Sequence, residues 1–179
     1  MANTQGTWVI TDGHIGDQPI ANVSTTQNHP FGTIRKAKDV GVTDYGEGEF
    51  IYVKGVASGA VGAWAGYEVE AGAQAGATIL AVANGNYPLG LMVSLLDATT
   101  DFGWLQISGH GVGKALTLFA DNAVCYLTST AGSVDDASVI GDVIHNAKGA
   151  NGAANTVGDL AGEVDINRPY CENRVSLTN

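Results

Sequence analysis

One segment, residues 100–137, restricts the fold of this chain more than any other: TDFGWLQISGHGVGKALTLFADNAVCYLTSTAGSVDDA. Aromatic and β-branched residues predict strands at 104–107 and 124–128, and the small residues after each strand predict a turn. The first of these turns would contain Gly109, Gly111 and Gly113. The segment does not bring together a nucleophile, a base and an orienting carboxylate, so it is typical of a scaffold rather than of a catalytic site.

Small residues recur along the whole 179-residue chain, which contains 25 Gly. Glycine is unfavourable inside a helix, whereas Val, Thr and Tyr favour strands. Further strand-like runs occur at 49–54, 61–69, 78–83, 89–96, 140–145 and 160–166. Their spacing of roughly 10 to 15 residues is typical of a sandwich or a barrel. We therefore predict an all-β protein with a single β-sandwich, jelly-roll or β-barrel-like domain, and at most one short helix at 114–121.

Three parts are expected along the chain: an extended N-terminal arm at 1–30, a β-rich body at 31–170 and a C-terminal tail at 171–179. The first part is polar, contains Pro19 and Pro30, and has apolar residues that are too scattered to form a core. Two interpretations stay open for it, an arm that crosses a neighbouring surface and a disordered tail. Asn167, Arg168, Pro169 and Tyr170 follow the last strand of the body and would lead into this tail.

Five apolar residues are candidates for contacts with another subunit. An apolar triplet in a polar arm gains little by remaining in water, and aromatic residues among Gly and Ala could be covered by a neighbour. The triplet is Trp8, Val9 and Ile10, and the aromatic pair is Trp64 and Tyr67. Because strands also leave edges that must be covered, we expect a homo-oligomer.

The chain is acidic, with 8 Lys and Arg against 18 Asp and Glu and a net charge of −10. This charge argues against nucleic acid and against an anionic membrane as partners. It is compatible with plain solubility and with docking on a more basic protein. The sequence has no apolar run long enough for a transmembrane helix and no secretory signal at its start, so we expect synthesis in a cytoplasm. Cys125 and Cys171 are expected to be free thiols, with Cys125 in the core.

The motifs that suggest chemistry fail on their spacing. In Gly109-His110-Gly111-Val112-Gly113-Lys114, a phosphate loop would need Gly where Ser108 stands and a hydroxyl residue where Ala115 stands. The dinucleotide-binding pattern fails as well, which leaves a glycine-rich turn or a bulge where backbones pass closely. The four histidines are dispersed, and the adjacent Asp135 and Asp136 face opposite sides of an extended chain. We predict no catalytic residues, no cofactor and no metal.

The body of the chain resembles the capsid decoration, or cement, proteins of tailed bacteriophages. The resemblance is carried by YGEGEFIYVKGVAS at 45–58, FGWLQISGHGVGKA at 102–115 and VCYLTSTAGSVDDA at 124–137. It continues in GDVIHNAKGA at 141–150 and DINRPY at 165–170, so it spans most of residues 31–170, while the first 30 residues match less well. None of these segments is a catalytic motif.

The resemblance implies a non-enzymatic virion protein, made in the host cytoplasm, that binds the outer surface of the capsid. Such proteins are β-rich, assemble as trimers or dimers and clamp neighbouring subunits of the major capsid protein. A homotrimer is the first expectation and a homodimer the alternative. Two other classes stay open: another phage structural protein, such as a head-fibre base, a tail component or a minor capsid protein, and a small jelly-roll enzyme.

Overall fold

The computed structural model describes residues 5–69, 76, 78–150 and 162–173. Over these residues the chain has eleven strands and no helix, which confirms the predicted all-β class. No helix long and apolar enough to cross a membrane is therefore found in the described ranges. The strands are β1 (Trp8–Ile10), β2 (Ile34–Asp39), β3 (Glu47–Lys54), β4 (Trp64–Tyr67), β5 (Thr78–Leu80), β6 (Tyr87–Met92), β7 (Phe102–Gly113), β8 (Val124–Leu127), β9 (Val134–Asp135), β10 (Val143–Gly149) and β11 (Gly162–Cys171).

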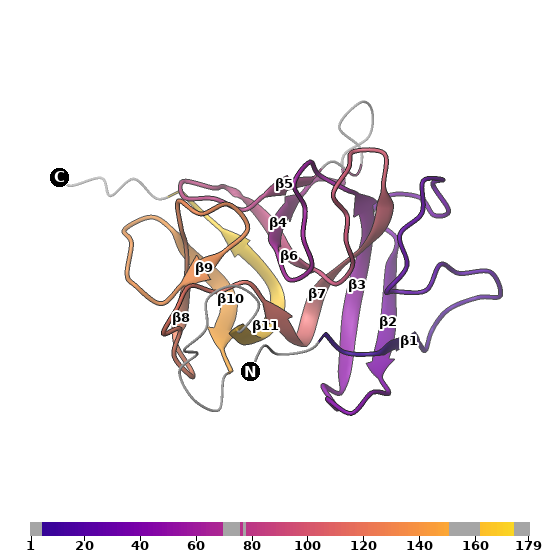
Figure 1. Ribbon diagram of the computed structural model, residues 1–179, viewed down its shortest axis with the longest axis horizontal. Helices are drawn as coiled ribbons and strands as arrows, with labels where there is room; N and C mark the ends of the chain where they lie inside the picture. Colours follow the sequence, from indigo (N-terminus) through magenta and orange to yellow (C-terminus); the bar gives the residue numbers. More distant parts are fainter. Residues whose placement is uncertain (1–4, 70–75, 77, 151–161, 174–179) are drawn as a thin grey trace.

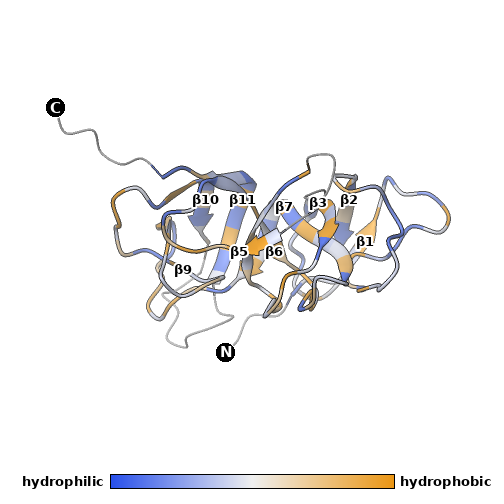
Figure 2. Cartoon of the chain, turned by 90° about the horizontal axis from the view of Figure 1, so that it is seen from above, coloured by the Kyte–Doolittle hydropathy of each residue, from blue (hydrophilic) through white to orange (hydrophobic). Residues whose placement is uncertain are grey.

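All eleven strands belong to one antiparallel sheet. Its main path runs β1-β2-β3-β7-β6-β11-β10-β8-β9, and β4 pairs with β6 and with β5 beside this path. In Figure 1 the strands β1 to β3 lie at one end of the molecule and β8 to β11 at the other, with β4 to β7 between them. In Figure 2, strands such as β7 and β11 show both polar and apolar colours along their length, as expected where one face covers a core and the other faces water.

Strand β7 connects the two ends of the molecule. Its first half pairs with β3, from Lys54↔Phe102 to Glu49↔Ser108. Its second half pairs with β11, from Asn167↔Ser108 to Gly162↔Gly113. Strand β6 pairs with both β7 and β11, so these three strands pair with one another. These three strands therefore join the two ends of the open sheet at its centre.

The glycines at 109, 111 and 113 are part of β7, so the turn predicted there is wrong. Gly109 has a φ of +101°, and a Cβ on it would overlap the carbonyl oxygen of Glu47 on β3. The register between β3 and β7 shifts next to this position, between Glu49 and Phe50. The structure instead agrees with the second interpretation of these glycines, a bulge where two backbones pass closely.

Three clusters of buried side chains fill the interior. The first surrounds Trp64 and Phe119, and the second lies around Leu105 and Met92. The third contains Phe50, Tyr52 and Trp104 from β3 and β7, together with Trp8 and Ile20 from the N-terminal segment. The first 30 residues therefore contribute two buried side chains to the core of the same chain, and their apolar residues are less scattered in space than along the sequence.

Several local expectations need correction. The segment 114–121 forms turns rather than a helix, and Leu118 has a φ of 74°, which a right-handed helix does not allow. Strand β11 continues to Cys171, so Asn167 to Tyr170 belong to the last strand and not to a tail. The residues predicted as tail, 171–179, are described only as far as 173. Strands β1, β2 and β9 were not expected from the sequence.

Candidate functional site

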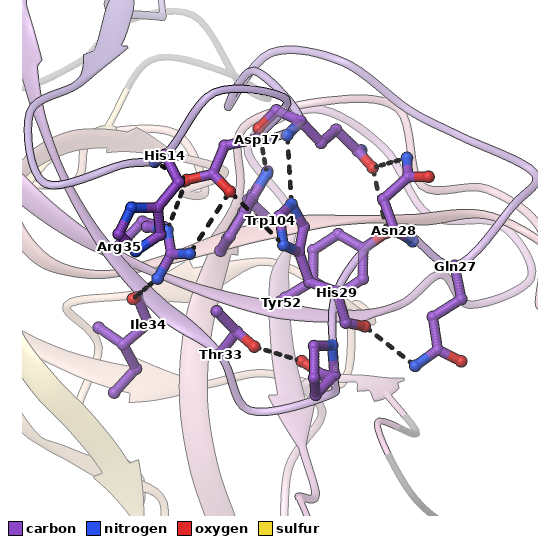
Figure 3. A network of polar contacts seen from close by, with 12 residues as sticks. His14, Asp17, Gln27, Asn28, His29, Thr33, Ile34, Arg35, Tyr52 and Trp104 are labelled. Carbon is purple, nitrogen blue, oxygen red and sulfur yellow. Dashed lines mark hydrogen bonds and ion pairs between the residues drawn. The ribbon is translucent and has the colours of Figure 1, made fainter.

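Gln18 joins the N-terminal segment to the body through a set of hydrogen bonds. Its partners Asn28, Tyr52 and Trp104 are labelled in Figure 3. Its backbone carbonyl accepts a hydrogen bond from Trp104 Nε1 at 3.0 Å. Its side-chain oxygen accepts from the Tyr52 hydroxyl at 3.0 Å and from Asn28 Nδ2 at 2.9 Å. Its side-chain nitrogen donates to the carbonyl of Phe102 at 3.0 Å. Since buried polar groups are costly unless they are paired, this set fixes the segment in one position.

Asp17 forms the charged part of the same network. Arg35 Nε on β2 donates to Asp17 Oδ2 at 2.8 Å, and the backbone N–H of His14 donates to the same oxygen at 2.9 Å. These donors stabilise the charged carboxylate and lower the pKa of Asp17 to about 2, with the hydrogen bond from Arg35 as the largest cause. The ion pair therefore ties the loop after β1 to the body.

His29 lies next to Asp17 but is not arranged as a general base. Its Nδ1 is 3.8 Å from Asp17 Oδ1, a pairing that resembles part of a catalytic triad. Its Nε2 accepts a hydrogen bond from the backbone N–H of Gln18 at 3.2 Å. The lone pair that would take a proton from a nucleophile is already used, and the side chain is only 9 % exposed. His29 therefore holds the segment in place.

A second group of charged side chains surrounds His110 on the outer face of β7, β10 and β11. His110 Nδ1 is 2.8 Å from Asp165 Oδ1, and Nε2 is 3.9 Å from Glu163 Oε2. Lys148 Nζ is 3.6 Å from the other oxygen of Asp165. The Tyr45 ring covers the imidazole at a centroid distance of 4.8 Å. Both ring nitrogens of His110 thus face carboxylates, as in a surface ion-pair cluster.

Neither cysteine is placed as a nucleophile. Cys125 and Cys171 are both buried and free, as the sequence predicted. Burial raises the pKa of the Cys125 thiol to about 12, so the reactive thiolate is scarce near neutral pH. Among the residues that the structure describes, no three His, Cys, Asp or Glu side chains are close enough together to hold a metal ion.

The predicted anchor triplet forms β1, the first strand along the path of the sheet. Trp8 is only 6 % exposed and packs edge-on against Phe50 with ring centroids 5.0 Å apart. Ile10 packs against the same cluster, whereas Val9 on the opposite face is 51 % exposed. Trp8 is thus an anchor within its own chain, and Val9 is the member of the triplet that is available to a partner.

The backbone of β1 has one side free for another strand. The carbonyl of Thr7 accepts from Val40 N–H, and Thr11 N–H donates to the carbonyl of Lys36, both at 2.9 Å. Backbone groups alternate in direction along a strand, so those of Val9 also point toward β2. The N–H and C=O groups of Trp8 and Ile10 therefore point away from β2. Among the described strands, β2 is the sole partner of β1.

Asp39 holds the start of β1 and was not identified from the sequence. It is 2 % exposed, and its carboxylate accepts hydrogen bonds from the Thr7 N–H, the Gly41 N–H, the Tyr45 N–H and the Thr43 hydroxyl. The hydrogen bonds lower the pKa of Asp39 against the effect of its burial, which is the largest single influence and raises the pKa. The sequence does contain a signal for this role: the motif Asp-x-Gly-x-Thr at 39–43 is typical of an Asx turn.

The aromatic pair predicted at a subunit contact is placed differently from the expectation. Trp64 on β4 is wholly buried in the first cluster, and a Cβ on Gly113 would be 2.7 Å from its Nε1. Trp64 is therefore a core residue, because the small residues around it make room for its ring rather than expose it. Tyr67 is partly buried and packs against the second cluster. That Tyr67 contacts a neighbour stays a prediction.

A shallow groove lies along β1. It is lined by Trp8, Val9, Ile10 and Thr11 on one side and by the loop that contains Gly13, His14, Ile15, Asp17 and Pro19 on the other. Ile15 is fully exposed in this loop. The free strand edge and this groove make the β1 region the best candidate for an interaction site.

No family model, no curated protein and no solved structure matched this chain in the comparisons.

Proposed function

We propose that this chain is a non-enzymatic structural protein of a tailed-phage virion. It binds the outer surface of the capsid as a homo-oligomer and cements neighbouring major capsid subunits. The resemblance to decoration proteins supports this proposal, and its segments at 45–58, 102–115 and 124–137 fall on β3, β7 and β8. The resemblance therefore covers the framework of the fold.

The observation that carries the proposal is a set of aliphatic side chains that are exposed to solvent in turns. Ile15, Val42 and Ile140 are 109 %, 104 % and 86 % exposed. Burying such a side chain is worth roughly 1.5–3 kcal/mol, so each is a favourable contact for another protein. All three residues lie in turns between strands, where a partner can reach them.

The charge of the chain supports a protein surface as the partner. The net charge of −10 favours docking on a more basic face and disfavours nucleic acid and anionic membranes. Surface ion pairs such as Arg168 with Glu49 and Lys148 with Asp165 use some of the few cations, so carboxylates remain in excess over the chain. We expect binding to weaken as the salt concentration rises, because salt screens such attraction.

The test uses heads assembled from the major capsid protein of the phage that encodes this chain. Purified chain is added, the heads are sedimented, and image reconstruction locates the added density. We expect density on the outside of the capsid, and heads that resist heating better than undecorated heads. Absence from the heads, or density on the tail instead, would overturn the proposal; the second result would favour the tail-component alternative.

Two matched variants make the binding experiment specific. A triple variant, Ile15→Ser, Val42→Ser and Ile140→Ser, replaces these three exposed aliphatic side chains. The control, Thr99→Ser, Thr100→Ser and Thr130→Ser, changes three exposed polar positions and leaves the aliphatic surface intact. The first variant should bind heads at least ten-fold more weakly than the control. Equal binding by both would show that these three side chains do not carry the contact.

A further inference from the structure

We infer that β1 is a contact between two copies of this chain, which pair their β1 strands antiparallel about a two-fold axis at Val9. The inference concerns the chain in solution and rests on no part of the proposed capsid function. It also selects the dimer, the alternative considered from the sequence, over the trimer.

Backbone geometry is the first support. The N–H and C=O groups of Trp8 and Ile10 point away from β2, toward the open side of the sheet. An axis at Val9 places Trp8 opposite Ile10 of the second copy, and Ile10 opposite Trp8. Each of these two pairs exchanges both N–H···O bonds, so the contact gains four hydrogen bonds. Val9 then faces Val9 of the second copy in a non-hydrogen-bonded pair, where side chains are closest.

The sequence of the strand is the second support, because it is nearly symmetric about Val9: Thr7-Trp8-Val9-Ile10-Thr11. The axis pairs Thr with Thr, an aromatic with a β-branched residue, and Val with Val, which are favourable cross-strand pairs. All five residues are uncharged in a chain with a net charge of −10. The flanking Asp12 would lie opposite Gly6, so no two carboxylates face each other directly.

The rigidity of β1 is the third support. Trp8 is buried against Phe50, and Asp39 bonds to the N–H of Thr7, so the strand is fixed before a partner arrives. A fixed strand has little freedom left to lose on pairing. The exposed side chain of Val9 would be partly removed from water at the same time.

The opposite end of the sheet is covered by its own chain. Strand β9 lies at that end, but Val134 forms a parallel bridge with Ala115. The N–H of Val134 donates to the carbonyl of Lys114 at 3.0 Å, and the carbonyl of Val134 accepts from Leu116 N–H at 2.8 Å. Of the two terminal strands on the main path, β1 is the one with an open side.

The test is the mass of the chain in solution, measured by light scattering coupled to size-exclusion chromatography. We expect the wild type to have the mass of two chains. Val9→Asp puts two carboxylates on the axis and should weaken the dimer at least about 100-fold, since facing like charges cost several kcal/mol. Ile79→Asp is the matched control: Ile79 is at the centre of the three-residue strand β5 and is 52 % exposed, against 51 % for Val9. Circular dichroism should show both variants folded.

Two further measurements fix the register. Mixing Val9→Asp with Val9→Lys should restore a heterodimer, because opposite charges then meet on the axis. Val9→Cys should form a disulfide-linked dimer under air, since the facing Cα atoms would be close enough for a disulfide, whereas Ile79→Cys should not. A monomeric wild type, a trimer, a dimer that Ile79→Asp dissociates or a Val9→Asp chain as dimeric as the wild type would each overturn the inference.

Discussion

At the scale of single residues, the N-terminal segment depends on one carboxylate. Asp17 is held charged by Arg35 and by the N–H of His14, and its pKa is about 2 instead of 3.8. A carboxyl whose folded pKa is lowered stabilises the fold above its unfolded pKa. That stabilisation is lost as the pH falls through the folded value. Asp17 should therefore stabilise the fold fully above about pH 4 and progressively less down to pH 2.

Asp17→Asn should lower the free energy of unfolding by about 2 kcal/mol at pH 7. The difference from the wild type should shrink between pH 4 and pH 2, because the wild-type carboxyl is then protonated as well. Urea unfolding at several pH values measures both effects. Asp44→Asn, at an exposed position, is the control. A difference that is the same at pH 2 and pH 7 would contradict this account of Asp17.

The two thiols give a second prediction at this scale. Cys125 and Cys171 are buried, and the pKa of Cys125 is raised to about 12. Because the thiolate is the form that reacts, a thiol reagent at pH 8 should leave the folded chain essentially unlabelled. Both thiols should react at once in denaturant. Rapid labelling of one thiol in the native chain would show that its strand opens readily.

At the scale of elements, β7 depends on glycine at one position. Gly109 has a positive φ, and a side chain there would overlap the backbone of β3 at Glu47. Gly46 also has a positive φ, of 77°, but no atom lies within 4 Å of its added Cβ. Gly109→Ala should therefore cost about 2–4 kcal/mol of stability, and Gly46→Ala only about 1 kcal/mol. Thermal and urea unfolding compare the two, and equal costs would argue against a close approach at Gly109.

The same strand shows how far the sequence predicts the elements. The runs at 49–54, 104–107 and 124–128 are rich in aromatic and β-branched residues, and strands occur at all three. The glycines at 109–113 were interpreted as a turn because glycine is common in turns. The local sequence does not show that the backbone of β3, which is distant along the chain, passes close to Gly109. Strand β2 was missed because its buried positions carry the small Ala37 and the charged Asp39, so the sequence shows no alternation of large apolar residues.

The candidate site was predicted only in part, for a related reason. Trp8, Val9 and Ile10 were identified as a group from their apolar character in a polar segment. Which of them is exposed depends on the pairing of β1 with β2, a contact across about thirty residues that no local pattern contains. Trp64 was assigned to the surface because its neighbours are small, whereas those neighbours line the cavity that it fills.

At the scale of the whole molecule, the N-terminal segment belongs to the core. Under either interpretation left open from the sequence, an arm or a disordered tail, the body would fold without residues 2–30. The structure predicts the opposite, because their removal takes away Trp8, Ile20 and Gln18 and exposes Phe50, Tyr52 and Trp104. Each lost apolar side chain costs roughly 1.5–3 kcal/mol.

The truncated chain lacking residues 2–30 should therefore be expanded or aggregated, or should melt at a clearly lower temperature than the full chain. Near-ultraviolet circular dichroism, which reports the packing of Tyr52 and Trp104, is the direct measurement. A control that lacks only residues 2–4 should keep the wild-type spectrum. An unchanged melting temperature after removal of 2–30 would show that the segment adds nothing to the body.

The pairing of β7 with strands from both ends of the molecule has a consequence for hydrogen exchange. It pairs with β3 and β6 near its start and with β11 near its end, so strands from both ends of the chain share its backbone. Separation of β3 or of β11 from the molecule breaks hydrogen bonds to this one strand. The amide hydrogens of β7 should exchange with solvent deuterium at one common slow rate, set by unfolding of the entire chain, while those of β1 and β5 exchange sooner through local fraying.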